Sequence, residues 1–334
     1  MKKIITIATV IIGSGLAGAA VLPANAVENS NEQHQRDPQA DESWTLVWSD
    51  EFDGDAIDFD KWRYEVDCWG GGNDERQCYT ARPENSFVSE GVLSIVARQE
   101  WMQGSALPKR LRITPEDEDK LAVKPFSSAK LTTQGNADWL YGRFEVRAKL
   151  PEGQGVWPAI WMLPASESYG GWAASGEIDI VEAVNLGASC RKCENKIENR
   201  IYGTLHFGGQ WPENVYKGKE TALPESEDGF HTFAIEWSEG EISWFVDDIK
   251  YSTLTSRSWR SSTRLGRKSK HAPFDHPFYL ILNLAVGGHL AEDNNDKGVS
   301  LEGYPKTMQV DWVRVYQRAG ANDPAGASQP SPQE

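Results

Sequence analysis

Three acidic residues stand close together in the segment Glu177-Ile178-Asp179-Ile180-Val181-Glu182. In a β-strand, side chains two positions apart share a face, so Glu177 and Asp179 would lie on one face and the isoleucines on the other. Strict alternation would place Glu182 on the isoleucine side, where an unpaired buried charge is costly. A one-residue bulge near residues 180–181 would return Glu182 to the face of Glu177. The sequence therefore predicts a bulged strand with three carboxylates on one face.

Carboxylates held this close suit the hydrolysis of glycosidic bonds with retention of configuration. That reaction uses one carboxylate as a nucleophile and a second carboxyl group as acid and then base, about 5–5.5 Å apart. Crowded like charges raise the pKa of one group, which keeps it protonated near neutral pH. The alternative is an exposed strand with three solvated acids, which the tryptophans around the segment disfavour.

Aromatic residues near the acids have the pattern of a sugar-binding surface. The segment 156–163 reads as a strand in which Trp157 and Trp161 share one face, while the residues on the other face are apolar. Sugars stack their C–H faces on aromatic rings, so both tryptophans are expected in a cleft beside the acids. The alternative places both in the core. Trp172, just before the acids, is a third candidate for substrate binding.

The segment from Gly176 to Glu182 resembles the E-x-D-x-x-E catalytic signature of glycoside hydrolase family 16, in the spacing of its laminarinase-like branch. The resemblance extends from Trp44 to Tyr316. It implies an all-β fold, a β-jelly-roll sandwich of two curved antiparallel sheets with a concave substrate cleft. Short strand-like segments punctuated by Gly and Pro, without a long helical period, favour a sandwich independently.

The resemblance assigns a role to each acid. Glu177 would be the nucleophile, and Glu182 would be the general acid and then the base that activates water. Asp179 would bond to one or both of these carboxyl groups and hold their pKa values apart. No cofactor is expected for catalysis.

Other residues match positions that contact substrate in the family. His206 lies in a segment, residues 203–209, that resembles the G-T-L-H-F-G-G of the laminarinase-like branch. It is expected to bond to sugar or to a catalytic carboxylate, the alternative being a structural histidine. Asn85 and Arg143 match positions that contact sugars on the non-reducing side, and Asn283 could line the cleft from a later strand.

Family members often carry a calcium ion on the convex side of the sandwich. The matching positions here are Glu51, the carbonyl of Gly91, and Asp311. Oxygen ligands from turns and a strand suit Ca²⁺, which would have a structural role. The alternative is that these are ordinary surface acids.

The N-terminal residues have the pattern of a targeting segment. Residues 1–26 combine a basic start, an apolar run and a small-residue cleavage site, which predicts a secretory signal peptide; a retained anchor is the alternative. Residues 27–42 are predicted to be a disordered lead-in, 43–318 the family 16 catalytic domain, and 319–334 a flexible tail. The mature chain is therefore expected to be secreted.

Charge and cysteine content narrow the classes of partner. The formal net charge of −15 argues against nucleic acid and anionic membranes, and it is compatible with a neutral polysaccharide. The one strong basic cluster, residues 264–270, has no visible link to the acids. Four cysteines in a secreted chain predict up to two disulfides of undetermined pairing, with a zinc site as the alternative. The protein is expected to be a monomer.

The leading hypothesis is a secreted endo-1,3-β-glucanase acting on laminarin-like or mixed-linked 1,3-1,4-β-glucan. Alternatives are another family 16 hydrolase of the galactan or carrageenan type, a glucan transglycosylase, and a non-catalytic glucan-binding recognition protein. Related recognition proteins lose the acids that this chain retains. Two segments, the cysteine-bearing insert after Glu182 and residues 287–292, depart from the family pattern and are expected to border the cleft.

Overall fold

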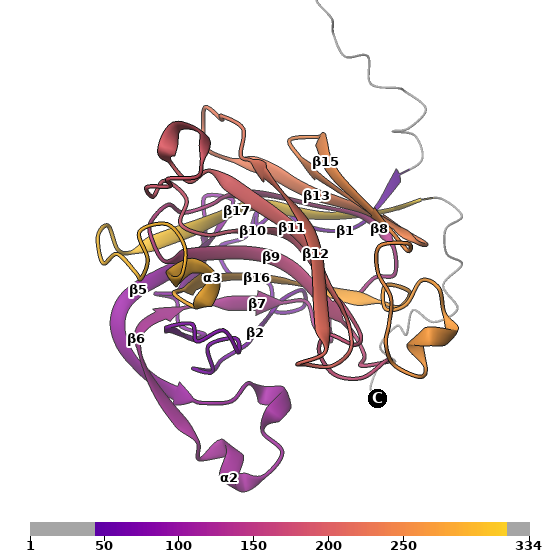
Figure 1. Ribbon diagram of the computed structural model, residues 1–334. Coiled ribbons are helices and arrows are strands. Elements are labelled where there is room, and N and C mark those ends of the chain that lie inside the picture. The colour runs from indigo at the N-terminus through magenta and orange to yellow at the C-terminus, as the bar shows by residue number, and fades with distance from the viewer. Residues whose placement is uncertain (1–43, 319–334) are drawn as a thin grey trace, which may run out of the picture. The chain divides into compact units, whose positions relative to one another are not determined.

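The computed structural model of the protein describes residues 44–318. The predicted signal peptide, lead-in and tail lie outside the described residues. Within the described part, the chain folds into two sheets (Figure 1), as predicted for a β-sandwich.

The strands that carry the candidate acids belong to a sheet of seven. Its spatial order is β12 (Asn214–Ala222), β11 (Arg200–Gly208), β10 (Glu177–Ala183), β9 (Val156–Pro164), β16 (Phe278–Val286), β7 (Lys130–Thr132) and β2 (Arg63–Tyr64). All of its pairings are antiparallel. In Figure 1, β10, β9 and β16 curve together through the middle of the fold. The strand β16, whose residues are all buried, lies near the middle of this sheet.

The second sheet has ten strands. Its main path is β15 (Ile249–Thr255), β14 (Glu241–Val246), β13 (His231–Ser238), β8 (Gly142–Lys149), β17 (Lys306–Arg318), β5 (Val92–Ser105), β6 (Leu121–Ser128) and β3 (Gln77–Tyr79). The strand β1 (Trp44–Asp50) pairs with β17, and β4 (Ser86–Ser89) pairs with β5. The pairing of β3 with β6 is parallel.

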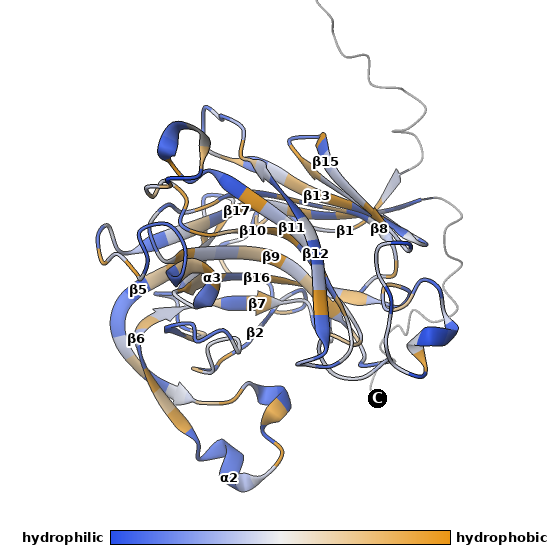
Figure 2. Ribbon diagram, in the orientation of Figure 1, coloured by the Kyte–Doolittle hydropathy of each residue, from blue (hydrophilic) through white to orange (hydrophobic). Residues whose placement is uncertain are grey.

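Alternation of apolar and polar residues builds the core between the sheets. Along β8, Phe144, Val146 and Ala148 are buried, whereas the residues between them are half-buried. Along β9, Ile160 and Met162 point into the same core. Figure 2 shows the resulting apolar colouring along the strands and the hydrophilic colouring of the connecting loops. Each such large side chain contributes about 1.5–3 kcal/mol on burial.

One hairpin extends from the sandwich. The strands β5 and β6 pair beyond the body of the sheet as this hairpin. Its tip carries the short helices η1 (Lys109–Leu111) and α2 (Pro115–Glu118). Leu121 and Val123 are exposed on one face of this hairpin, here called the arm, whereas Ala122 and Lys124 on its other face are half-buried. The loop that contains Cys68 packs on that half-buried face, where a Cβ on Gly104 would lie 2.9 Å from Cys68 Sγ.

All four cysteines lie in disulfides, Cys68–Cys78 and Cys190–Cys193. The zinc alternative is therefore wrong, because no free thiolate remains to bind the ion. The described helices are short, including α3 (His289–Glu292), η2 (Glu194–Lys196) and η3 (Gly266–Lys268). Across residues 44–318, none is long and apolar enough to cross a membrane.

Candidate active site

The predicted bulge is present in β10. Opposite β9, Asp179 pairs with Trp161 and Val181 pairs with Ile160, so Ile180 is the extra residue. Opposite β11, the register also shifts between Asp179 and Glu182. The bulge turns Glu182 onto the face of Glu177 and Asp179, and all three line one cavity. The cost of burying a third acid in the core correctly predicted this irregularity.

The bulge is tied to the other sheet by a buried tryptophan. The indole nitrogen of Trp244, on β14, donates a hydrogen bond to the backbone carbonyl of Asp179 at 2.8 Å. Gly203, on β11, lies where this indole passes, and a Cβ at that position would stand 2.4 Å from the Trp244 ring. Because no side chain fits there, the glycine in the G-T-L-H-F-G-G segment is needed for the bulge to be anchored.

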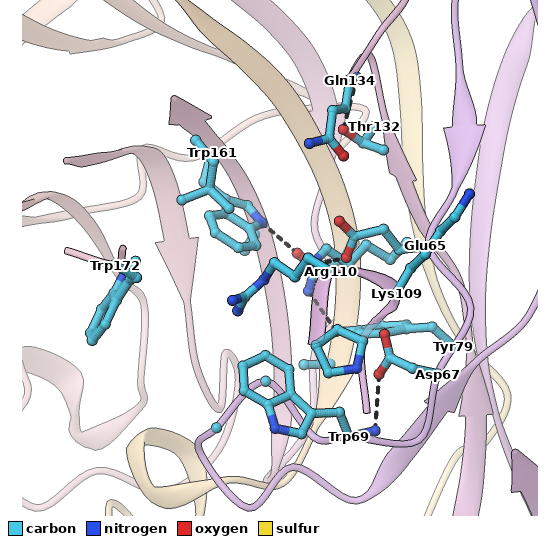
Figure 3. Close-up of a pocket in the computed structure, with 18 of the residues that line it drawn as sticks. Glu65, Asp67, Trp69, Tyr79, Lys109, Arg110, Thr132, Gln134, Trp161 and Trp172 are labelled. Atoms are coloured by element: carbon cyan, nitrogen blue, oxygen red, sulfur yellow. Dashed lines mark hydrogen bonds and ion pairs between the residues drawn. The ribbon is translucent and has the colours of Figure 1, made fainter. Parts of the chain in front are cut away.

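The cavity is a cleft of about 1000 Å³ along one face of the seven-stranded sheet. Alternate residues of β9 line it, with Trp157 and Trp161 among them, as expected from their parity. Tyr279 and Asn283 line it from β16. Figure 3 shows the rings of Trp161, Trp172 and Trp69 around the same hollow. The cleft therefore offers aromatic surfaces on several sides of the acids.

Two of these tryptophans hold the two outer acids. The indole nitrogen of Trp172 donates to Glu177 Oε2 at 2.8 Å, and that of Trp157 donates to Glu182 Oε1 at 3.0 Å. Each carboxyl group is thereby fixed through one oxygen, and its other oxygen is left for chemistry. Trp157 is only 8% exposed and packs with Val184 and Ala291, so it is both a core and a cleft residue.

Burial and crowding keep protons on these acids. Burial, and next the charge of Asp179, raise the pKa of Glu182 to about 8. The same two causes raise the pKa of Glu177 to about 7. Burial and the neighbouring carboxylates therefore favour the protonated form of Glu182 near neutral pH. An acid and an anionic nucleophile can therefore coexist near neutral pH.

His206, on β11, adds a positive charge beside the acids. Its Nε2 atom lies 3.2 Å from Asp179 Oδ2 and 3.6 Å from Glu177 Oε1. Burial alone would lower the pKa of His206, but the carboxylates of Glu177, Asp179 and Glu182 outweigh it and raise that pKa to about 10. Ligand atoms of Glu177, Asp179 and His206 converge within 4.8 Å, as in a metal site. The raised pKa favours the protonated imidazole, which has no lone pair to offer a metal ion.

Asn85 does not line the cleft, and its predicted contact with sugar is wrong. Its side chain is fully buried, where Nδ2 donates to the Val96 carbonyl at 3.0 Å and to Ser127 at 2.8 Å, while Oδ1 accepts from Thr80 at 2.6 Å. These hydrogen bonds satisfy the donors and the acceptor of the Asn85 side-chain amide. Carbohydrate cannot reach it without breaking them.

The predicted contact of Arg143 with sugar is also wrong. It lies on β8 in the ten-stranded sheet, outside the cleft. Its guanidinium binds Glu145 at 2.5 Å, Glu236 at 2.9 Å and Asp248 at 2.9 Å. With its donors shared among three carboxylates, Arg143 stabilises the outer face of the sandwich.

The proposed calcium ligands do not present a free donor set. Both oxygens of Glu51 accept hydrogen bonds from Arg314, at 3.0 and 2.7 Å. Asp311 is paired with Arg147 at 2.5 Å. Because both carboxylates are neutralised by arginines, their present arrangement does not fit a calcium ion, which prefers unpaired oxygen ligands.

Several cationic residues that were not predicted line the cleft. The guanidinium of Arg110, on the arm, lies 5.2 Å from the ring centre of Trp69 and reaches into the pocket in Figure 3. Lys130 Nζ lies 4.8 Å from the ring centre of Trp161 and pairs with Glu65 at 2.7 Å. Cations other than the basic cluster at residues 264–270 therefore line the cleft.

The two segments that depart from the family pattern pack against each other behind Trp157. Asn185 donates to the Ala291 carbonyl and to Asn295, both at 2.9 Å. Neither the cysteine-bearing insert nor residues 287–292 supply a residue to the described lining of the cleft, but Ala291 packs against Trp157. Residues 287–289 do border the cleft as expected, since a Cβ on Gly288 would lie 3.2 Å from Trp157 and the N–H of His289 donates to the carbonyl of Asn73 at 3.0 Å.

Comparisons with known proteins agree with this geometry. The sequence model of the glycosyl hydrolases family 16 matches residues 99–314. The β-glucanase of Rhodothermus marinus is 41% identical over 278 residues, which cover 82% of this chain and 85% of that protein. The glucan endo-1,3-β-glucosidase A1 of Niallia circulans is 39% identical over 81% of this chain, but the chain spans only 37% of that longer protein.

A solved structure has the same fold. The X-ray structure of the laminarinase from Rhodothermus marinus superposes with a TM-score of 0.65 at 40% identity, and the match covers 83% of this chain and 98% of that one. The family model covers more than half of the chain, and the acids of the family signature lie together in a cleft. The chain therefore belongs to glycoside hydrolase family 16.

Proposed function

We propose that this glycoside hydrolase is a secreted, monomeric endo-β-glucanase that cleaves 1,3-β-linked glucan with retention of configuration. The observation that carries the proposal is the bulge in β10, which places Glu182 beside Glu177 in an aromatic cleft. The names of the relatives, a β-glucanase and a laminarinase, support a β-glucan substrate. A cleft with aromatic surfaces on several sides supports binding of a chain rather than of a terminal sugar.

In the first step of the proposed reaction, an oxygen of Glu177 attacks the anomeric carbon. The bond to the leaving oxygen breaks as Glu182, protonated because its pKa is raised, transfers its proton to that oxygen. The product is a glycosyl ester of Glu177 and a shortened glucan. Trp172 keeps Glu177 aligned through Oε2, so that the other oxygen is directed to the sugar.

In the second step, Glu182 acts as a base. Its carboxylate takes a proton from a water molecule, whose oxygen attacks the anomeric carbon and displaces Glu177. Asp179 and the protonated His206 form an ion pair between the two glutamates. This pair limits the repulsion among the acids while the charge moves from Glu177 to Glu182 and back.

Product analysis on a panel of polysaccharides tests the substrate. We expect oligosaccharides of mixed length from laminarin and from mixed-linked β-glucan, and no cleavage of agarose or κ-carrageenan. Cleavage of only the galactans would overturn the glucan assignment. Products longer than the starting oligosaccharides, formed in preference to hydrolysis, would indicate a transglycosylase, and binding of laminarin without cleavage would indicate a recognition protein.

The anomeric form of the first product tests the geometry of the bulge. With the two carboxyl groups about 5–5.5 Å apart, no water fits between them, and retention is required. We expect proton NMR, recorded before mutarotation, to show the β-anomer first. Initial release of the α-anomer would require a pair of acids about 6.5–9.5 Å apart and would contradict the roles given to Glu177 and Glu182.

Replacement of Trp161 should separate binding from stability. Trp161 is half-buried in the cleft, and its indole nitrogen donates to Asn283 at 2.6 Å. We expect Trp161→Ala to weaken binding of laminarin by about 1–3 kcal/mol, measured by affinity electrophoresis. The matched control is Trp237→Ala in the core, expected to lose roughly 3–5 kcal/mol of stability. A large loss of stability with unchanged affinity in Trp161→Ala would show that Trp161 does not bind substrate.

The calcium ion stays a prediction of the family resemblance. To bind it, Glu51 and Asp311 would have to exchange their arginine partners for the ion. A calcium site predicts a higher melting temperature in excess CaCl₂ than in EDTA, and loss of that difference in Asp311→Asn. Equal melting temperatures of the wild-type protein in the two conditions would leave Glu51 and Asp311 as arginine partners only.

A further inference from the structure

A strongly basic loop lies outside the chemistry described above. Residues 256–270, between β15 and β16, contain six Lys and Arg residues and no acid, in a chain whose formal net charge is −15. All six are exposed, and no described residue accepts a side-chain hydrogen bond or forms an ion pair with any of them. They are Arg257, Arg260, Arg264, Arg267, Lys268 and Lys270. Figure 2 shows the short helix η3 of this basic loop in the hydrophilic colour.

The basic loop encloses a hollow of its own. A cavity of about 450 Å³ is lined by cations and by serine residues, namely Arg260, Arg267, Lys270, Ser256, Ser261, Ser262 and Ser269. Guanidinium, ammonium and hydroxyl groups are all hydrogen-bond donors, and they suit a phosphate or sulfate group. A carboxylate touches this lining at one end, where Asp275 accepts from Ser269 at 2.5 Å and from Tyr169 at 2.9 Å.

The basic loop is joined to the strand that carries His206. The backbone N–H of Ser262 donates to the carbonyl of Gly208, at the end of β11, at 2.9 Å. Shortly after Gly208, the backbone N–H of Trp211 donates to the carbonyl of Trp172 at 3.0 Å, and both tryptophans line the catalytic cleft. The second cavity is therefore next to one end of the cleft. In Figure 1 the loop lies on the side of the fold away from the arm.

We propose that the basic loop binds phosphate or sulfate groups of an anionic polymer that accompanies the glucan, and so holds the enzyme beside its substrate. Six unpaired cations on a few residues form a local positive field within an acidic protein, which attracts repeated oxyanions. Trp259, the loop's one aromatic residue, is 4% exposed and donates to the His271 carbonyl, so no ring is free to stack on bases. This favours a polymer without bases over a nucleic acid.

Binding to two labelled polymers tests the proposal and identifies the oxyanion. The probes are poly(glycerol phosphate) and dextran sulfate, with neutral dextran as reference, and the readout is fluorescence anisotropy of the full chain at two salt concentrations. We expect Arg260→Ser/Arg267→Ser/Lys270→Ser to weaken binding of at least one probe by about tenfold and to reduce its salt dependence. The probe that loses more identifies phosphate or sulfate as the group recognised.

The matched control removes the same number of charges elsewhere. Lys217, Lys219 and Lys297 are exposed and lie outside both cavities, and their replacement by Ser should change the affinity less than twofold. Equal losses in the two triple variants, or no binding of either polymer to the wild type, would overturn the site. Tighter binding of single-stranded DNA than of both polymers would overturn the choice of partner. Because none of these measurements requires cleavage, their outcome is independent of the proposed glucanase activity.

Discussion

Replacement of Glu177 by Gln is expected to abolish glucan hydrolysis, with a loss of kcat on the order of 10⁴-fold or more. The amide keeps the size of the side chain and can still accept the hydrogen bond from Trp172, but it has no negative charge with which to attack the anomeric carbon. Binding of laminarin should be retained, because the rings that line the cleft are unchanged. Reducing-sugar release and affinity electrophoresis measure the two properties separately.

The control for this substitution is a glutamate of the same charge that lies outside the cleft. Glu167, in the loop between β9 and β10, is exposed, and Glu167→Gln should leave kcat within about twofold. Hydrolysis by Glu177→Gln within tenfold of the wild type would remove Glu177 from the role of nucleophile. Loss of activity together with a large fall in melting temperature would instead indicate a structural role for its bond to Trp172.

The features that were predicted correctly from the sequence are those that leave a local pattern. The parity of residues 156–163 placed Trp157 and Trp161 on one face, and the structure puts both in the cleft. The bulge was predicted because the alternative, an acid among the isoleucines of β10, carries a large desolvation cost. In each case the sequence pattern and the structural feature that it predicts lie within one strand.

The features that were missed depend on contacts between distant segments. Asn85 and Arg143 are polar residues whose partners, such as Ser127 and Asp248, come from other strands, so nothing in their own segments shows that those partners satisfy them. Arg110 reaches the cleft only because the arm folds toward it. Matching single residues to family positions does not predict which residues at the end of such a hairpin will reach the cleft.

The cluster of acids is held in place by its surroundings rather than by its own attractions. Burial and mutual repulsion raise the pKa values of Glu177 and Glu182. The hydrogen bonds from Trp172 and Trp157, and the positive charge of His206, act in the opposite direction. Because the bulge is itself anchored through Trp244, the ten-stranded sheet contributes to the geometry of a site that it does not line.

Replacement of Glu182 by Ala should produce a defect that depends on the leaving group. Natural glucan needs a proton on its leaving oxygen, so its hydrolysis should fall by about 10²–10⁴-fold. A dinitrophenyl β-glycoside needs no such proton, so Glu177 should still form the glycosyl ester from it. The second step should then become limiting, because no base activates water. A burst of dinitrophenolate, followed by slow turnover, is the expected stopped-flow result.

Added azide should then distinguish the two glutamates by stereochemistry. In Glu182→Ala, azide fills the space left by the side chain and attacks the ester of Glu177 without help from a base, which accelerates turnover and yields the β-glycosyl azide. If the roles were reversed, Glu182 would be the nucleophile, and azide would replace it directly to give the α-glycosyl azide. Glu177→Ala is the matched variant and should give the α-azide from the dinitrophenyl β-glycoside, because direct displacement by azide inverts the anomeric centre. An α-azide from Glu182→Ala would therefore exchange the assignments of Glu177 and Glu182, and the absence of any azide product would show that Glu182 is not the acid and base.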